Sequence, residues 1–126
     1  QNDPIAVGKA VAKKYHCVTA ITGAKDVITD GRRVAVISNG VPQMGKITGT
    51  GCMLSGVIGA YVGANEDFFE GTVTAITSMG MAGEIAYEAA KDKGTGSLRT
   101  GIIDALSRLD DRQIGGKGKI YYEAWN

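Results

Sequence analysis

Hydrophobic positions along the chain switch between helical and strand-like spacing. Apolar residues recur every three or four positions over residues 3–15, 53–62, 66–90 and 97–109, which predicts four helices. Short runs rich in β-branched residues over 17–22, 26–29, 34–38 and 119–124 predict four strands. The order is helix, three strands, loop, three helices and a last strand. We therefore expect a fold of the α/β class, with helices flanking a sheet.

Local signals predict several helix ends. Asp3 is expected to cap the first helix, with Pro4 at its first position, and His16 to close it. Asn65 and Ser97 are expected to cap the third and fourth helices, because their side chains can accept hydrogen bonds from first-turn N–H groups. The buried face of the first helix is expected to carry Ile5, Gly8, Val11 or Ala12, and Tyr15.

The strand pattern predicts a mixed sheet. Residues 17–22 are apolar on both faces, which is typical of a buried strand in a parallel or mixed sheet. The dipeptide Asp30-Gly31 favours a tight hairpin between the second and third strands. Because a buried strand needs neighbours on both edges, we expect part of the sheet to lie outside this chain.

The long third helix has two glycines, Gly80 and Gly83, in the middle of its apolar face. Each costs about 1 kcal/mol relative to Ala in a helix, so another group is expected to pack very close there. Two interpretations remain open: the glycines serve helix packing, or Gly80 to Gly83 leaves room for a nucleotide ring.

Composition and charge narrow the class of protein. The 126 residues predict one α/β unit spanning 1–126, and 44% hydrophobic residues fit a folded chain. A net charge of +1 gives no electrostatic reason to bind nucleic acid or an anionic membrane, and no apolar run approaches a membrane span of roughly 18–20 residues. Two widely spaced cysteines favour a cytoplasmic location. The first residue, Gln1, suggests a processed or truncated product.

Gly49, Thr50 and Gly51 lead into the second helix and carry the strongest chemical signal. Glycines let the backbone approach a ligand, and the first-turn N–H groups with the helix dipole favour an anion. The segment lacks the Lys of a Walker P-loop and the Gly-X-Gly-X-X-Gly spacing of dinucleotide folds. The residues alone therefore leave two interpretations open: an anion hole, or a tight glycine loop.

The segment Ile47-Thr48-Gly49-Thr50-Gly51-Cys52-Met53-Leu54 resembles the signature of the hydroxyethylthiazole kinases, a family of the ribokinase-like superfamily. Most of that superfamily has Asp where this chain has Cys52, whereas the thiazole kinases have Cys. Segments 18–23, 26–31, 39–45 and 94–99 also resemble family motifs, in family order.

The resemblance implies ATP- and Mg²⁺-dependent phosphorylation of the hydroxyl of 4-methyl-5-(2-hydroxyethyl)thiazole, in thiamine salvage. It implies that Thr22 contacts ATP, that Gly49 contacts the substrate and that Cys52 is catalytic. It also implies that Gly49, Thr50 and Gly51 form an anion hole for the transferring phosphoryl group. No residue of this chain is assigned to a metal.

Cys52 stands where a carboxylate base is usual, although a thiol has a reference pKa of about 8.5. Phosphoryl transfer passes through a loose transition state in which positioning and charge stabilisation dominate, so a weaker base suffices. A helix N-terminus also lowers the pKa of a thiol in general. Without the resemblance, Cys52 would be interpreted as a small buried residue at a helix start.

The implied fold is the C-terminal portion of a ribokinase-like three-layer α/β sandwich, with a mostly parallel sheet flanked by helices. Family chains are roughly twice this length, so the resemblance implies a missing N-terminal half that holds a basic ATP contact and the acidic magnesium region. It also implies a homotrimer. Three alternatives stay open: a nucleotide-dependent dehydratase that repairs hydrated NAD(P)H, a hydroxymethylpyrimidine kinase, and an inactive nucleotide-binding fragment.

Overall fold

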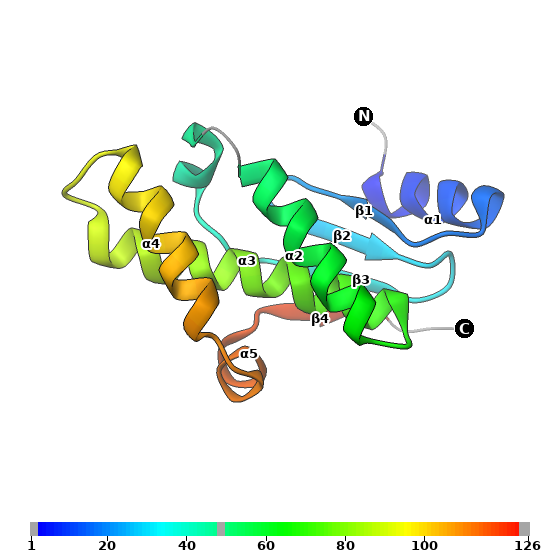
Figure 1. Ribbon diagram of the computed structural model, residues 1–126. Helices are drawn as coiled ribbons and strands as arrows, with labels where there is room; N and C mark the ends of the chain where they lie inside the picture. Colours follow the sequence, from blue (N-terminus) through cyan, green and yellow to red (C-terminus); the bar gives the residue numbers. More distant parts are fainter. Residues whose placement is uncertain (1–2, 48–49, 124–126) are drawn as a thin grey trace.

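The computed structural model describes residues 3–47 and 50–123 and confirms the α/β class. Figure 1 shows a small sheet with one helix on one side and a group of helices on the other. In chain order the elements are α1 (Pro4–Tyr15), β1 (Thr19–Ile21), β2 (Asp26–Thr29), β3 (Val34–Ile37), the 3₁₀ helix η1 (Pro42–Lys46), α2 (Thr50–Ala64), α3 (Phe68–Ala90), α4 (Thr95–Arg108), α5 (Asp111–Lys117) and β4 (Ile120–Tyr122).

The described strands form one sheet in the order β1-β2-β3-β4, and each neighbouring pair is antiparallel. The prediction of a mostly parallel sheet is therefore wrong for these strands. Short connections explain the result for β1, β2 and β3, because residues 22–25 and 30–33 cannot supply the dozen or more residues of a parallel crossover. The predicted hairpin turn is confirmed, and Gly31 has a φ of +99° there.

The strand predicted as buried lies at an edge of this sheet. β1 pairs with β2 alone among the described strands, and Ala20 at its centre is exposed. Its apolar residues gave the signal for a buried strand, but burial also needs a neighbour on the second edge.

Helices cover both faces of the sheet. α1 lies against one face of β1 and β2, where a Cβ atom at Gly8 would be 3.1 Å from the methyl group of Thr29. On the other face Ile28, Ala35 and Ile37 pack against residues of α3, and Leu54 and Ile58 of α2 join this cluster. The described chain therefore has the layered arrangement of a sandwich (Figure 1). The residues that α3 contributes to the cluster are Phe69, Val73 and Ile76.

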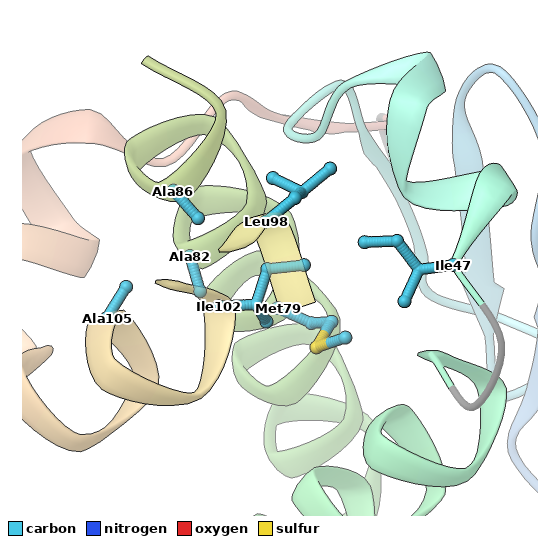
Figure 2. Packing of buried hydrophobic residues seen from close by; sticks show 7 residues of the cluster. All are labelled: Ile47, Met79, Ala82, Ala86, Leu98, Ile102 and Ala105. Carbon is cyan, nitrogen blue, oxygen red and sulfur yellow. The ribbon is translucent and has the colours of Figure 1, made fainter. Parts of the chain in front are cut away.

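A second cluster joins α3 to α4. Figure 2 shows side chains of both helices on the side that faces Ile47, the residue after η1, which belongs to the same cluster. On α4, Leu98, Ile102 and Ala105 are all buried, which confirms the helical apolar spacing predicted over residues 97–109. The α3 residues of this cluster are Met79, Ala82 and Ala86.

The helix ends test the predicted caps. Asp3 accepts a hydrogen bond from the Ile5 N–H at 3.0 Å, and His16 closes α1 in the left-handed conformation, so both predictions are confirmed. The predicted cap Asn65 is wrong by two residues, because Asp67 caps α3 and Asn65 instead accepts the Asp67 N–H.

Two other helix predictions are also wrong. Ser97 caps nothing, since α4 already begins at Thr95. On α1 the predicted buried face holds at Gly8 and Ala12, whereas Tyr15 is 65% exposed. Among the described residues, no helix combines the length and the apolar character that crossing a membrane requires.

Candidate functional site

The principal cavity of the described residues has a volume of about 580 Å³ and lies where the end of β1, the loop before η1, and helices α2 and α3 meet. Its lining is mainly apolar, with a few polar groups, which is the usual composition of a small-molecule site. The residues that line it are Thr22, Gly23, Ala24, Asp26, Asn39, Gly40, Val41, Pro42, Met44, Gly45, Leu54, Ile76, Met79 and Gly80.

One wall follows β1 directly. Thr22 is the first residue after the strand, and the next residue, Gly23, donates its N–H to the Asp26 carboxylate at 3.1 Å. This hydrogen bond closes the turn between β1 and β2. Burial raises the pKa of Asp26 above its ordinary value, and the bond from Gly23 opposes that rise. The wall thus presents a hydroxyl group and a partly desolvated carboxyl group to the cavity.

A second part of the lining is the segment from Asn39 to Gly45, which joins the end of β3 to η1 and includes most of η1. Gly40 has a φ of +118°, a conformation that favours glycine, and it turns the chain from β3 into η1. The Met44 N–H donates to the carbonyl of Val41 at 3.1 Å and keeps this segment compact. The loop rests on α3, where the Met44 side chain occupies the space beside Gly83.

The two glycines of α3 therefore have a described partner each. A Cβ atom at Gly80 would collide with the main chain of Asn39, and one at Gly83 would collide with the side chain of Met44. The prediction that another group packs very close is confirmed. The Met44 side chain fills the space beside Gly83, whereas Gly80 lines the cavity, so room for a nucleotide ring stays a hypothesis for the Gly80 end of this segment.

The predicted site residues converge on one region as far as the structure describes them. Thr22 lines the cavity, and so does Leu54 of α2, two residues after Cys52. Thr50, Gly51 and Cys52 form the first turn of α2, whose N-terminal N–H groups have no partner inside the helix. Gly49 lies outside the described residues. The N-terminal part of α2 thus borders the cavity that Thr22 lines.

The arrangement suits a ligand with an apolar ring and an anionic group. Apolar side chains of α2 and α3 offer a surface for a ring, and the N-terminus of α2 favours a negative charge. The described residues do not supply a matching site for magnesium. Among them, no three His, Cys, Asp or Glu side chains lie close enough together to hold a metal ion. Asp26 is the carboxylate that lines the cavity.

Sequence reasoning missed several lining residues. The sequence predicts a loop that resembles a family motif at Asn39, Gly40 and Pro42, but it assigns these residues no part in ligand binding. Asp26, which also lines the cavity, is predicted only as part of a strand. Their turn-forming residue types were the available signal for a loop. Nothing local indicated that this loop would fold back onto α3, which begins more than twenty residues later.

Comparisons with known proteins point to one family. The sequence model of the hydroxyethylthiazole kinase family matches residues 1–112. The chain is 51% identical over 119 residues to a hydroxyethylthiazole kinase of Ruminiclostridium cellulolyticum, covering 94% of this chain and 44% of that protein. It is 40% identical over 122 residues to the enzyme of the same name from Thermoanaerobacter pseudethanolicus, covering 97% of this chain and 46% of that protein.

A solved structure has the same fold. The hydroxyethylthiazole kinase protein from Pyrococcus horikoshii OT3 superposes with a TM-score of 0.88 at 33% identity, covering 95% of this chain and 46% of that one. The ribokinase-like fold class is thereby confirmed. The chain spans less than half the length of these relatives. From the family match over residues 1–112 and from these relatives, the chain belongs to the hydroxyethylthiazole kinase family.

Proposed function

We propose that the enzyme containing this chain transfers the γ-phosphoryl group of ATP to the hydroxyl of 4-methyl-5-(2-hydroxyethyl)thiazole, in thiamine salvage. The observation that carries the proposal is the family match, joined to a cavity that Thr22 and the N-terminal part of α2 both border. Relatives that are 40% to 51% identical carry the name of this kinase, which favours it over a dehydratase or a pyrimidine kinase.

In the proposed reaction, the alcohol oxygen attacks the γ-phosphorus, and the bond from that phosphorus to the β,γ-bridging oxygen breaks, so ADP leaves. The proton of the alcohol passes to the thiolate of Cys52. Backbone N–H groups of Gly49, Thr50 and Gly51 would meet the phosphoryl oxygens, because the first turn of a helix offers unpaired donors. Gly49 would also contact the thiazole alcohol, and Thr22 would contact ATP.

Magnesium would accompany ATP in this reaction and neutralise phosphate charge. The described residues supply no cluster of ligands for it, so we assign no step and no metal ligand of this chain to the ion. We infer that its protein ligands, and a basic contact to ATP, come from the rest of the enzyme.

The proposed partner of this chain is the N-terminal half of the same enzyme. The chain covers 44% of the Ruminiclostridium relative, and α1 presents an exposed stripe of Val7, Val11 and Tyr15 at spacings of four residues. Exposed apolar stripes of this kind mark interaction surfaces. We therefore expect residues 1–126 to form a C-terminal unit that is inactive alone. The complete enzyme is proposed to be a cytoplasmic homotrimer, by resemblance.

The test combines mass and activity. The intact mass of the denatured sample shows whether the chain occurs alone at 13.1 kDa or as part of a chain of about twice that mass. The complete enzyme is then incubated with ATP, Mg²⁺ and the thiazole alcohol, and product is identified by a mass increase of one phosphoryl group. ATP binding without any transfer to the thiazole alcohol would contradict the proposed function. Transfer by the isolated 126-residue chain would contradict the need for a second half.

A further inference from the structure

A partly buried polar cluster ties the cavity loop to two distant elements. The side chain of Asn39, which is 6% exposed, donates from Nδ2 to the carbonyl of Lys117 at 3.2 Å and accepts the Lys119 N–H at 2.5 Å. The same Nδ2 lies 3.3 Å from both carboxylate oxygens of Glu84. One amide group thus connects the loop after β3 to α3 and to the chain entering β4.

Glu84 is the second member of this cluster. Its Oε1 accepts the backbone N–H of Gly40 at 2.9 Å, and Lys119 Nζ lies 3.7 Å from the same oxygen. Glu84 stands one helical turn after Gly80 on α3, so the two residues share a face. Gly80 allows the loop to approach the helix, and Glu84 then holds the loop by the Gly40 N–H and the side-chain amide of Asn39.

The bonds to Glu84 bear directly on the cavity. Asn39 and Gly40 line it, whereas Glu84 does not. The lining segment after β1 is held separately, by the bond between Gly23 and Asp26. Two segments that line the cavity are thus held by different contacts, one to Asp26 of β2 and one to Glu84 of α3.

We propose that Glu84 is a positioning residue for nucleotide binding: its carboxylate fixes the Asn39–Gly45 wall against α3 and so sets the shape of the site that receives ATP. The proposal rests on the proposed function, because it takes ATP as the ligand of this cavity. In this proposal Glu84 contacts no reacting atom and acts only by holding the loop in place.

A purely structural role makes a different prediction. If Glu84 only stabilised the fold, its loss would lower the unfolding temperature, but the remaining folded protein would bind ATP with unchanged affinity. If it positions the wall, the folded variant itself binds ATP more weakly, while kcat at saturating ATP changes little. The split between KM and kcat separates the two roles.

The experiment uses the full-length enzyme with Glu84→Ala, Glu84→Gln and Glu88→Gln. Gln at 84 keeps an oxygen acceptor for the Gly40 N–H and is the conservative variant. Glu88 is one turn further along α3, pairs with Lys91 at 2.9 Å and has a side chain that is 75% exposed, so it is the matched control. The dissociation constant of ATP is measured by calorimetry without the thiazole, and KM for ATP and kcat are measured with it.

Glu84→Ala is expected to raise the dissociation constant and KM for ATP about fivefold to tenfold, because the Asn39–Gly45 wall loses its hydrogen bonds to α3, with kcat within about twofold of wild type. Glu84→Gln is expected to recover much of the affinity, and Glu88→Gln to match wild type. Amide hydrogen exchange over residues 40–46 should accelerate in Glu84→Ala only.

A folded Glu84→Ala enzyme that binds ATP as tightly as wild type would overturn the proposal. An enzyme that binds ATP but does not phosphorylate the thiazole alcohol would refute the proposed function alone. The ATP dissociation constants of the variants would still test whether Glu84 positions the cavity wall. An enzyme that binds no ATP would overturn both.

Discussion

The main chain of Asn39 lies directly on Gly80, so close that a Cβ atom at position 80 would be 2.7 Å from both the carbonyl carbon and the carbonyl oxygen of Asn39. Real Cβ atoms do not approach main-chain atoms this closely, so any side chain at position 80 must push the loop away from α3. Because Asn39 lines the cavity, this contact links the packing of a helix to the shape of the candidate site.

Gly80→Ala is expected to destabilise the protein and to weaken ATP binding. Ala gains about 1 kcal/mol over Gly inside a helix, whereas overpacking a tight contact costs typically 1–3 kcal/mol. We expect a net loss of about 1 kcal/mol in the free energy of unfolding, measured by urea denaturation of the full-length protein, and a higher dissociation constant for ATP.

Gly115→Ala is the control for this substitution. Gly115 lies inside α5, and a Cβ atom there would have no other group within 4 Å. The variant is expected to gain up to about 1 kcal/mol of stability from helix propensity, with unchanged ATP binding. Equal stability gains in Gly80→Ala and Gly115→Ala would contradict the close contact with Asn39.

Thr22→Ala tests the predicted ATP contact. Thr22 lies at the end of β1 and lines the cavity, so its hydroxyl is available to a ligand there. Removal of the hydroxyl is expected to raise KM for ATP about tenfold, while Thr22→Ser stays close to wild type because it keeps the hydroxyl. Steady-state kinetics at varied ATP would measure both. Parallel losses in Thr22→Ala and Thr22→Ser would instead point to packing by the methyl group.

Cys52 gives a prediction about the base. Cys52→Asp is expected to retain or increase turnover, because a carboxylate accepts a hydroxyl proton at neutral pH more readily than a thiol. Cys52→Ala is expected to lower kcat about tenfold or more, a modest effect for a base because the transition state is loose. The measurement is kcat with saturating ATP and thiazole alcohol. An inactive Cys52→Asp enzyme that folds and binds ATP normally would refute the role of Cys52 as a base.

Local chemistry explains which elements could be predicted. The Asp3 cap, the left-handed His16 and the Asp30-Gly31 turn each depend on neighbours within four residues, and the structure confirms all three. The α5 helix was missed although Asp110 and Gln113 form a capping box, since the segment is short and has few apolar residues. Signals contained in a few adjacent residues were therefore sufficient for both ends of α1 and for the Asp30-Gly31 turn, but not for the starts of α3, α4 and α5.

The parts that could not be predicted depend on residues far apart in the chain or on strands outside the described residues. The edge position of β1 is decided by which strands are present beside it, which its own apolar pattern cannot show. Likewise, Asn39 and Glu84 are 45 residues apart, and neither has a local feature that marks a hydrogen bond between them. The glycines of α3 predicted a close contact, but its partner became known only from the fold.

Arg33 and Asp67 give a prediction about pH. Arg33 Nη2 donates to Asp67 Oδ1 at 2.9 Å, and its Nε donates to Asp30 at 2.7 Å, so the guanidinium joins the β2–β3 hairpin to the N-terminus of α3. The hydrogen bonds from Arg33 lower the pKa of Asp67 below its ordinary value, and the N–H groups of Glu70 and Phe69 add to this. In the folded protein Asp67 therefore stays ionised at a pH where the unfolded chain already takes up a proton.

The direction in which stability changes with pH follows from this lowered pKa. Stability from Asp67 is complete above the unfolded pKa of about 4 and is lost as the pH falls through the folded value. Asp67→Asn keeps a capping side chain but removes the charge, so we expect it to cost about 1 kcal/mol or less at pH 7, because the Asp67 side chain is 39% exposed. Urea denaturation at pH 7, 4 and 3 should show that the difference in free energy of unfolding between wild type and Asp67→Asn shrinks as the pH falls.

Asp104→Asn is the control. Asp104 lies on the exposed face of α4, so this variant removes a charge without touching Arg33 and should show no such convergence with wild type. A gap between wild type and Asp67→Asn that stayed constant over this range would show that the ion pair contributes nothing to stability.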